Sequence, residues 1–592
     1  MLYGFNMKQS VIANWIDDEN NKVYLFLVGI SVLLTIFWLI IIKTFVPPLP
    51  IYDEWKTMVP WAGDSVFSSI LSFFTSSGHH EQKSLIGSLL NIFISPVVGY
   101  WRLSYVGVLF NCFVSVFIIS FIRKIRGSSR FTDVIIPLAL FHSSLVFGYF
   151  RPDMTCFAFL IGIASIAMTM LAVPSEKTAA WHHFIIGFCL ILLSVNTSTG
   201  VVYAAFLGGV YFFKNLLFLR KGNKKAVIAV VLFTVIAAAL SLNYVLSIRC
   251  ASFTISGMNQ SSFADKFECS MTGIGAALGE LGLHLRWKAG VLILVFVCLS
   301  LASLFIQYRR TVISLSTFLS SAGLLFTCCV SPVIIGIARG GWSDAALRHM
   351  FIFMQFPVAL CLCWITLESV SKWSVILRNS FFALFVVSFI YSCPTIGLLG
   401  VEKLSLYNKL MADIEQGLPV EFIAARNSYG LSMYSANILE SHMKVFKERH
   451  ARPFDQIKDF TYKSETELSI PLCIVEHNAK RDDVSGRYSG EKAADAYLEI
   501  RLPKKQYVKA IQIEFSMTAD FTEKESVPRC SVSCFSRNSE GNIAAYEQCT
   551  LIILGDANNK LNVWIDAEID SILFKPGMDN FSLNVKSIKV YD

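Results

Sequence analysis

The chain has 592 residues, of which 54% are hydrophobic and only 16% are charged, and its mean hydropathy is +0.55. Soluble globular proteins average about 45–50% apolar and about 25% charged residues, so this composition excludes an ordinary soluble enzyme and indicates a polytopic membrane protein with a soluble part. The net charge of +8 is modest, and we attribute it to an excess of Lys and Arg in cytoplasmic loops rather than to nucleic-acid binding.

The N-terminal part of the chain predicts a cytoplasmic tail followed by a signal anchor. Residues 1–22 are polar. The apolar run that follows, 23–42, has about 20 residues, enough to cross a bilayer, and no cleavable signal peptide is expected before it. The predicted transmembrane domain covers 23–400.

Apolar runs separated by polar breaks predict about eleven membrane-spanning helices. The predicted spans are 23–46, 103–122, 134–150, 154–173, two shortened helices within 184–211, 226–248, 290–306, 312–337, 350–367 and 381–399. The two shortened helices meet at a polar break, 196–200, which is expected to line a cavity because unwound backbone at membrane depth needs a polar environment. The apolar stretch 84–98 is too short to span and is interpreted as a re-entrant or interfacial helix.

Basic clusters give the expected orientation. They occur at 123–130, 214–225, 309–310 and 372–378, after alternate spans. The positive-inside rule places these clusters in the cytoplasm. The loop after the first span and the turn at Arg151 then lie outside, and an odd number of spans also puts the C-terminus outside.

The composition changes after residue 400. The segment 401–459 is amphipathic and predicts a helical connector. From 460 to 592 short alternating segments such as 498–502 predict an all-β domain, β-sandwich-like in architecture. One or two disulfides are expected in an oxidising compartment among four cysteines of this part, Cys473, Cys530, Cys534 and Cys549. The domain has no catalytic signature, and both a structural cap and a sugar-contacting module remain open.

The loop after the first span carries the main candidate catalytic residues. Asp53 and Glu54 lie side by side, flanked by Tyr52 and Trp55, whose aromatic rings favour a membrane interface. A carboxylate at this boundary can act as general base on a sugar hydroxyl. The alternative is that these acids only mark a helix end in water, where charged residues cost little.

The same loop continues with His79, His80, Glu81 and Lys83. Their spacing is not that of a zinc-binding helix, so we expect neither a metal site nor a cofactor. A solvated loop is the simpler interpretation, and hydrogen bonding to an acceptor or a phosphate is the functional one.

Three arginines, Arg151, Arg339 and Arg348, fall on the predicted outer side, where Lys and Arg are normally depleted. A guanidinium fork matches the geometry of a phosphate, so they are candidates for a phosphate clamp. Asp153 would either pair with Arg151 and position it or contact a hydroxyl. Snorkelling to lipid headgroups is the alternative for all three arginines.

These motifs resemble those of polytopic GT-C-type glycosyltransferases, in particular the bacterial O-antigen-modifying glucosyltransferases encoded with serotype-converting phages (Gtr type). The resemblance covers roughly residues 20–455. Gln82-Lys83 stands where family members tend to have His-Arg, and His349 where they tend to have Tyr. The residues that carry the resemblance are Asp53-Glu54-Trp55, His80-Glu81, Arg339-Gly340-Gly341, Ala346-Leu347-Arg348-His349 and Arg452-Pro453-Phe454.

The resemblance implies transfer of a sugar, with glucose expected, from an undecaprenyl-phosphate donor onto lipid-linked O-antigen of lipopolysaccharide. The reaction would occur at the periplasmic face of the bacterial inner membrane, with the C-terminal domain in the periplasm and with a polyprenyl-phosphate sugar synthase and a flippase as partners. A donor with one phosphate requires no metal. By analogy the catalytic residues are Asp53 as base with Glu54 or Glu81 as its partner, the donor phosphate is held by Arg151, Arg339 and Arg348, and the substrates are positioned by Trp55, His79, His80, Lys83 and Asp153.

Two other functions compete with this one. A transporter or flippase of a lipid-linked glycan would place ionisable groups near the bilayer midplane, whereas the apolar spans here carry almost none. A glycosyltransferase could also act on lipid A or on another acceptor of the cell envelope.

Overall fold

The computed structural model describes residues 19–50, 84–94, 100–173, 178–216, 224–250, 262–339, 349–367, 372–432, 435–491, 495–520, 531–537, 543–544, 550–576 and 580–592. The chain divides into two compact units. The first contains the helices up to Val401, and the second contains Glu402–Asp592.

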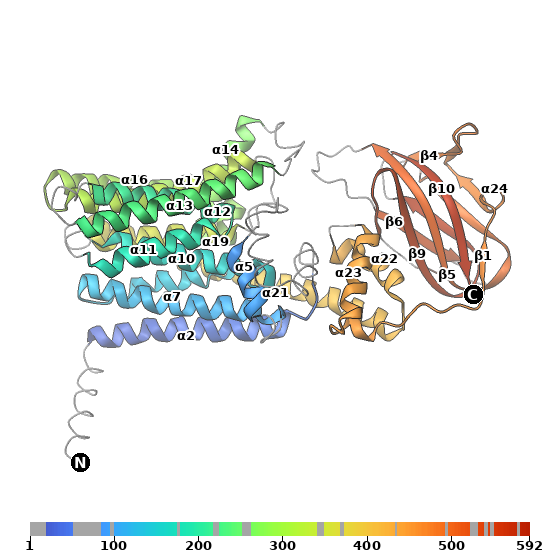
Figure 1. The fold of residues 1–592 in the computed structure, drawn as a ribbon, viewed down its shortest axis with the longest axis horizontal. Helices are drawn as coiled ribbons and strands as arrows, with labels where there is room; N and C mark the ends of the chain where they lie inside the picture. The colour runs from blue at the N-terminus through green and yellow to red at the C-terminus, as the bar shows by residue number, and fades with distance from the viewer. Residues whose placement is uncertain are drawn as a thin grey trace, which may run out of the picture. The chain divides into compact units, whose positions relative to one another are not determined.

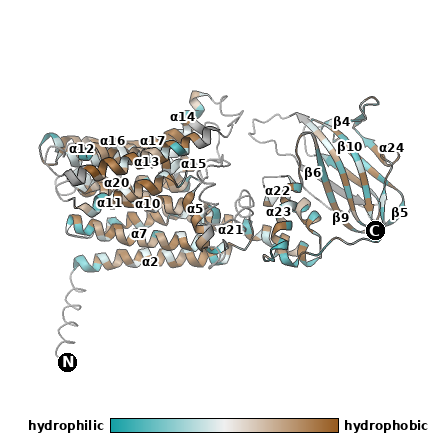
Figure 2. Ribbon diagram, in the orientation of Figure 1, coloured by the Kyte–Doolittle hydropathy of each residue, from teal (hydrophilic) through white to brown (hydrophobic). Residues whose placement is uncertain are grey.

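The first unit is a helical bundle, and its long helices are predominantly hydrophobic (Figures 1 and 2). Its helices are α2 (Glu19–Phe45), α5 (Leu85–Leu89), α7 (Leu103–Arg126), α8 (Ile135–Leu140), α9 (Val146–Tyr149), α10 (Thr155–Ala172), α11 (Ala180–Ser194), α12 (Ser198–Leu216), α13 (Lys224–Cys250), α14 (Phe263–Gly275), α15 (Gly279–Leu285), α16 (Trp287–Arg309), α17 (Leu315–Arg339), α19 (Met350–Phe353), α20 (Gln355–Leu367) and α21 (Lys372–Glu415), which includes residues of both units. Shorter turns are η1 (Leu90–Ile94), η2 (Tyr100–Arg102), η3 (Phe131–Val134), η4 (Ser143–Leu145), η5 (Pro152–Met154) and η9 (Ala276–Leu278).

Within the described residues, 9 helical segments are long and apolar enough to cross a membrane, so the protein is a multi-pass membrane protein. Each of them overlaps one of the predicted spans. The other two predicted spans fall on α11 and α12. The break between these helices is at 195–197, so the predicted break at 196–200 is only partly confirmed, since 198–200 begin α12. The total of eleven spans stays a prediction.

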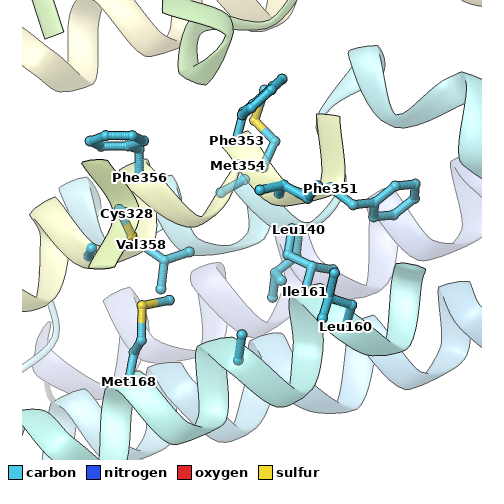
Figure 3. Packing of buried hydrophobic residues seen from close by; sticks show 14 of the residues in the cluster. Leu140, Leu160, Ile161, Met168, Cys328, Phe351, Phe353, Met354, Phe356 and Val358 are labelled. Atoms are coloured by element: carbon cyan, nitrogen blue, oxygen red, sulfur yellow. The ribbon is translucent and has the colours of Figure 1, made fainter. Parts of the chain in front are cut away.

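The core of the bundle lies between α10 and the segment α19–α20. Met168 of α10 and Val358 of α20 point toward one another in Figure 3, and both are fully buried. Close approach of α9 to this core depends on Gly148, because a Cβ there would lie 1.9 Å from a ring carbon of Phe351. Packing of small against large side chains is how helices associate in lipid, where the hydrophobic effect between helices is weak.

The span 131–149 is not one continuous helix but is broken after α8. The backbone N–H of Ser144 donates to Nδ1 of His142 at 3.2 Å, and Nε1 of Trp38 donates to the carbonyl oxygen of Phe141 at 3.0 Å. Side chains therefore satisfy the backbone groups that the break releases, as burial in a membrane protein requires.

The segment 263–285 is the main departure from the expected organisation. The sequence predicts a polar loop there, but α14, η9 and α15 form a helical hairpin that packs on α16 and α17. A Cβ on Gly282 would lie 1.9 Å from the carbonyl oxygen of Gly275, so α15 folds back directly onto α14. We call 263–285 the re-entrant hairpin. It escaped prediction because its first turns carry Asp265, Lys266 and Glu268 and because α14 is too short to span.

The second unit combines helices with a β-rich domain. The helices are α22 (Val420–Leu431), α23 (Ala436–Glu448), η10 (Phe454–Gln456) and α24 (Ile470–Cys473), and the strands are β1 (Glu465–Glu467), β2 (Ile474–His477), β3 (Lys480–Arg481), β4 (Tyr488–Glu491), β5 (Tyr497–Asp520), β6 (Ser531–Arg537), β7 (Ile543–Ala544), β8 (Thr550–Leu551), β9 (Gly555–Pro576) and β10 (Asn580–Tyr591). Alternate residues of β5, for example Ile511, Ile513 and Phe515, are fully buried, which confirms the predicted period of two.

The strands confirm a β-rich domain, and its sandwich-like architecture stays a prediction. They form one antiparallel sheet in the order β3-β4-β10-β5-β9-β6-β7, with β1 on β10, β2 on β5 and β8 on β6. Strands β5 and β9 are long, with 24 and 22 residues. Strands of this length, bent at register shifts, can pair with different neighbours along their course.

The thiol of Cys473 is free and buried, so the expected disulfides of this domain do not include it. Burial raises the pKa of this thiol to about 11, which keeps it protonated and unreactive near neutral pH. Cys530 and Cys549 lie outside the described residues, and the side chain of Cys534 is not described.

The packing of the re-entrant hairpin predicts a difference between two helical glycines. A Cβ on Gly290 of α16 would lie 2.1 Å from the carbonyl oxygen of Met271, whereas a Cβ on Gly29 of α2 meets no atom within 4 Å. We expect Gly290→Ala to lower the thermal unfolding temperature in detergent, because overpacking costs about 1–3 kcal/mol. Gly29→Ala should leave it unchanged or raise it, since alanine is favoured in helices. Equal stability of the two variants would contradict the hairpin packing.

Candidate functional site

The structure describes two of the predicted site residues with their side chains, Arg151 and Asp153. Arg339 is the last residue of α17, and its side chain is not described. The remaining predicted site residues lie outside the described residues and stay predictions: Asp53, Glu54, Trp55, His79, His80, Glu81, Lys83 and Arg348.

Arg151 and Asp153 form a buried ion pair. Nε of Arg151 donates to Oδ1 of Asp153 at 3.1 Å, and Nη2 donates to Oδ2 at 2.7 Å. The two side chains are only 5% and 3% exposed. The guanidinium also lies 5.3 Å from the ring centroid of Phe147, close enough for a cation–π contact. Pairing with Arg151 is thus one of the two roles expected for Asp153, and it fixes the orientation of the guanidinium.

The local sequence explains this geometry. Pro152 disfavours helical backbone at the residue before it, and Arg151 is extended, with φ −119° and ψ 109°. Pro152 then starts the η5 turn, where its missing N–H is no loss. The chain reverses here between α9 and α10, and the two-residue spacing brings the carboxylate of Asp153 back to the guanidinium.

A second polar cluster joins the break between α11 and α12 to the start of α5. Oγ of Ser84 donates to Oδ1 of Asn196 at 2.6 Å, and Nδ2 of Asn196 donates to the carbonyl oxygen of Cys156 at 2.9 Å. The N–H of Leu85 donates to the carbonyl oxygen of Val195 at 2.9 Å. Asn196 is fully buried and engaged on both sides of its amide, so it does not line a cavity as the sequence suggested. Its role is to anchor α5 against α10.

Ser84 is the site residue that the sequence analysis missed. It caps α5, because the N–H of Gly87 donates to its Oγ at 2.9 Å. A serine directly before an apolar run is a known helix-start signal and could have identified it. It also ends the predicted catalytic loop, 51–83. The end of that loop is therefore linked through Asn196 to Cys156, three residues after Asp153, and the sulfhydryl of Cys156 contacts the carbonyl oxygen of Asp153 at 3.5 Å.

A matched ion pair lies at the other end of the same span. Asp133, in η3, accepts from Nη1 of Arg126 at 3.1 Å and pairs with its Nη2 as well. The backbone N–H of Arg130 donates to the same carboxylate at 2.9 Å. Arg151 and Asp133 thus mark opposite ends of 131–149, and we call these the Arg151 end and the Asp133 end of the bundle.

The Arg151 end offers the guanidinium of Arg151, which Asp153 holds in place and partly neutralises. The end of the predicted catalytic loop, 51–83, is linked to the same part of the bundle through Ser84 and Asn196. Oriented guanidinium groups are suited to planar, two-point recognition of phosphate or carboxylate. Among the described residues, no group of three or more His, Cys, Asp or Glu side chains could hold a metal ion.

Comparisons with known proteins assign no family: no protein-family model matches the sequence, and no curated protein matches it. The resemblance to GT-C-type transferases stays a prediction carried by short motifs. The function must be inferred from the residues themselves.

The burial of the Arg151–Asp153 pair predicts a large effect of its removal. Asp153→Asn removes the charge of a carboxylate that pairs with a buried guanidinium, which should destabilise the protein by about 3–5 kcal/mol. The control is Glu268→Gln, which removes a pair with Arg286 that is 3.7 Å long and has side chains 49% and 71% exposed. That change should cost about 1 kcal/mol or less. Unfolding in detergent, by heat or by denaturant, measures the loss of stability in both variants. Equal losses would contradict the burial of the Arg151–Asp153 pair.

Proposed function

We propose that the protein is a membrane glycosyltransferase that moves a sugar, glucose in the first instance, from a polyprenyl-phosphate donor to lipid-linked O-antigen. The proposed site of the reaction is the periplasmic face of a bacterial inner membrane. The observation that carries the proposal is the buried, oriented Arg151 at the end of a membrane span, linked through Asn196 and Ser84 to the end of the acid-bearing loop.

The donor places two demands on such a site. Its phosphate lies at the level of the lipid headgroups while its polyprenyl chain stays in the bilayer, so the group that holds the phosphate must lie at the end of a span. Arg151 meets this demand, since it directly follows the span 131–149. Asp153 holds the guanidinium in one orientation, which lowers the entropy cost of binding phosphate.

The reaction also needs a base near the acceptor hydroxyl. The base, with Asp53 proposed and Glu54 or Glu81 as its partner, removes the hydroxyl proton while the hydroxyl oxygen attacks the anomeric carbon. The bond from that carbon to the phosphate oxygen breaks through an oxocarbenium-like transition state, and polyprenyl phosphate leaves with the electron pair. Arg151 stabilises the charge that develops on the leaving phosphate. Arg339, Arg348 and the remaining predicted positioning residues would complete the site.

A transporter or flippase of a lipid-linked glycan is the second candidate. The break of the span 131–149 at the buried His142 favours it, because discontinuous helices form the binding sites of many transporters. The distribution of charge favours the transferase. In the described part of the first unit, buried charged residues lie near helix ends, among them Asp133, Arg151, Asp153, Lys214 and Arg378. A transferase with lipid A or another envelope acceptor would use the same donor site.

A transfer assay with purified protein tests the proposal. With undecaprenyl-phosphate-[14C]glucose and lipid-linked O-antigen, the wild type should produce labelled glycan. Arg151→Lys should lower kcat/KM by about 10²-fold, because a lysine cannot reproduce the two-point contact with phosphate.

The matched control is Arg126→Lys, which alters the buried pair at the Asp133 end and should leave kcat/KM within about threefold of wild type if it folds. Equal activity of the two variants would remove Arg151 from the donor site. Movement of the intact labelled lipid across a vesicle membrane, without transfer of glucose, would favour the transporter.

A further inference from the structure

The tip of the re-entrant hairpin is fixed between the broken span and α21. Gly279 has φ +58°, and a Cβ there would lie 2.3 Å from Cε1 of His142 and 2.4 Å from Oγ of Ser144. The hydroxyl of Ser388 donates to the carbonyl oxygen of Leu278. Only glycine fits this close approach, so the position of the residue that follows it, Glu280, is set by packing on both sides.

The hydroxyl groups around the tip are used by the backbone and not by the carboxylate. The N–H of Glu280 donates to Oγ of Ser144 at 2.9 Å and to Oγ of Ser392 at 3.1 Å. The side chain of Glu280 is partly buried, and its Oε1 is out of contact with solvent. In the part of the chain that the structure describes, this oxygen accepts no hydrogen bond. A buried carboxylate oxygen in this state is unfavourable, and a donor supplied by a ligand would relieve it.

The surroundings of Glu280 fit a ligand with hydroxyl groups better than a metal ion. No described group of three or more His, Cys, Asp or Glu side chains could hold a metal, and the neighbouring Ser144 and Ser392 already accept from the backbone. His284 lies one helical turn after Glu280, and residues at this spacing share a helix face. Its ring lies 6.4 Å from that of Tyr391. Both side chains are exposed, so the face that carries Glu280 leads to accessible polar and aromatic groups, the types that line sugar sites.

The hairpin reaches this position from the Arg151 end. Gly336, three residues before the end of α17, packs against Ser270 of α14, where a Cβ would lie 2.1 Å from the serine Oγ. The end of α17 and the start of α19 lie at the same end of the bundle, because only a short segment of the sequence separates them. This is the Arg151 end, since Phe351 of α19 packs on Gly148, three residues before Arg151. Glu280 therefore belongs to the half of the bundle in which the donor phosphate is proposed to bind.

We propose that Glu280 binds a hydroxyl group of the sugar on the donor lipid. It would so distinguish the sugar-bearing donor from polyprenyl phosphate, the lipid that remains after the sugar has been transferred. This inference rests on the proposed glycosyltransferase function. Its distinguishing feature is a preference for the sugar-bearing lipid that depends on one carboxylate far from Arg151 in the sequence.

The test compares two lipids and three proteins. Dissociation constants for undecaprenyl-phosphate-glucose and for undecaprenyl phosphate are measured by native mass spectrometry on the full chain, as wild type, Glu280→Gln and Glu268→Gln. The last variant is the control, because it removes an exposed carboxylate of the same hairpin. We expect the wild type and the control to bind the glucose-bearing lipid about tenfold more tightly than undecaprenyl phosphate. Glu280→Gln should lose this preference while its affinity for undecaprenyl phosphate stays the same.

Thermal unfolding without lipid separates binding from folding. Because Glu280→Gln keeps the shape of the side chain and removes a partly buried charge whose Oε1 accepts no hydrogen bond among the described residues, the variant should be at least as stable as the wild type. A marked loss of stability would show a structural role and overturn the inference. Retention of the sugar preference by Glu280→Gln would overturn the inference alone. Failure of the wild type to bind either lipid would overturn the proposed function and the inference with it.

Discussion

The structure of the helical unit depends on one constraint: inside a membrane, every backbone N–H and carbonyl group must find its partner within the protein. Continuous helices meet this demand by themselves, but each break in a helix releases groups that a side chain must satisfy. Trp38 does so for the break at Phe141, Asn196 links the break before α12 to α10, and Ser388 does so for the hairpin tip. These three side chains are thus explained by the breaks in the helices.

The same constraint gathers functional groups at one end. Where helices are interrupted, buried polar residues are tolerated, and the break at 195–197 lies beside the start of α10, at the Arg151 end. Ser84 with Asn196 and Glu280 with Ser144 come from segments 112 and 136 residues apart in the sequence, whereas Arg151 and Asp153 lie in one turn. A transferase with a membrane-bound donor needs such an arrangement, with polar groups at the lipid boundary and an apolar bundle beneath them. The second unit supplies a separate β-rich domain whose role in this chemistry is open between a structural cap and a sugar-contacting module.

Hydropathy alone predicted the nine candidate membrane-spanning segments of the described residues, because lipid imposes a one-dimensional pattern of about 20 apolar residues. The pairing of Arg151 with Asp153 could also be predicted from the sequence, since both residues lie in one turn. The re-entrant hairpin could not, because its polar first turns resemble a loop and its packing depends on close backbone approach at Gly275, Gly282 and Gly290. Glu280 was missed for the same reason: its partners Ser144 and Ser392 lie on other helices. The sandwich-like architecture stays a prediction, because alternation reveals strands but not how long strands pair.

The central claim is sugar transfer to O-antigen with Asp53 as the base. The most direct measurement is the chemical structure of O-antigen from cells that carry the wild-type protein or Asp53→Asn at matched expression. The account predicts an added sugar branch with the wild type and none with the variant. A branch in both would assign the base to another acid, and an unchanged polysaccharide in both would contradict O-antigen as the acceptor.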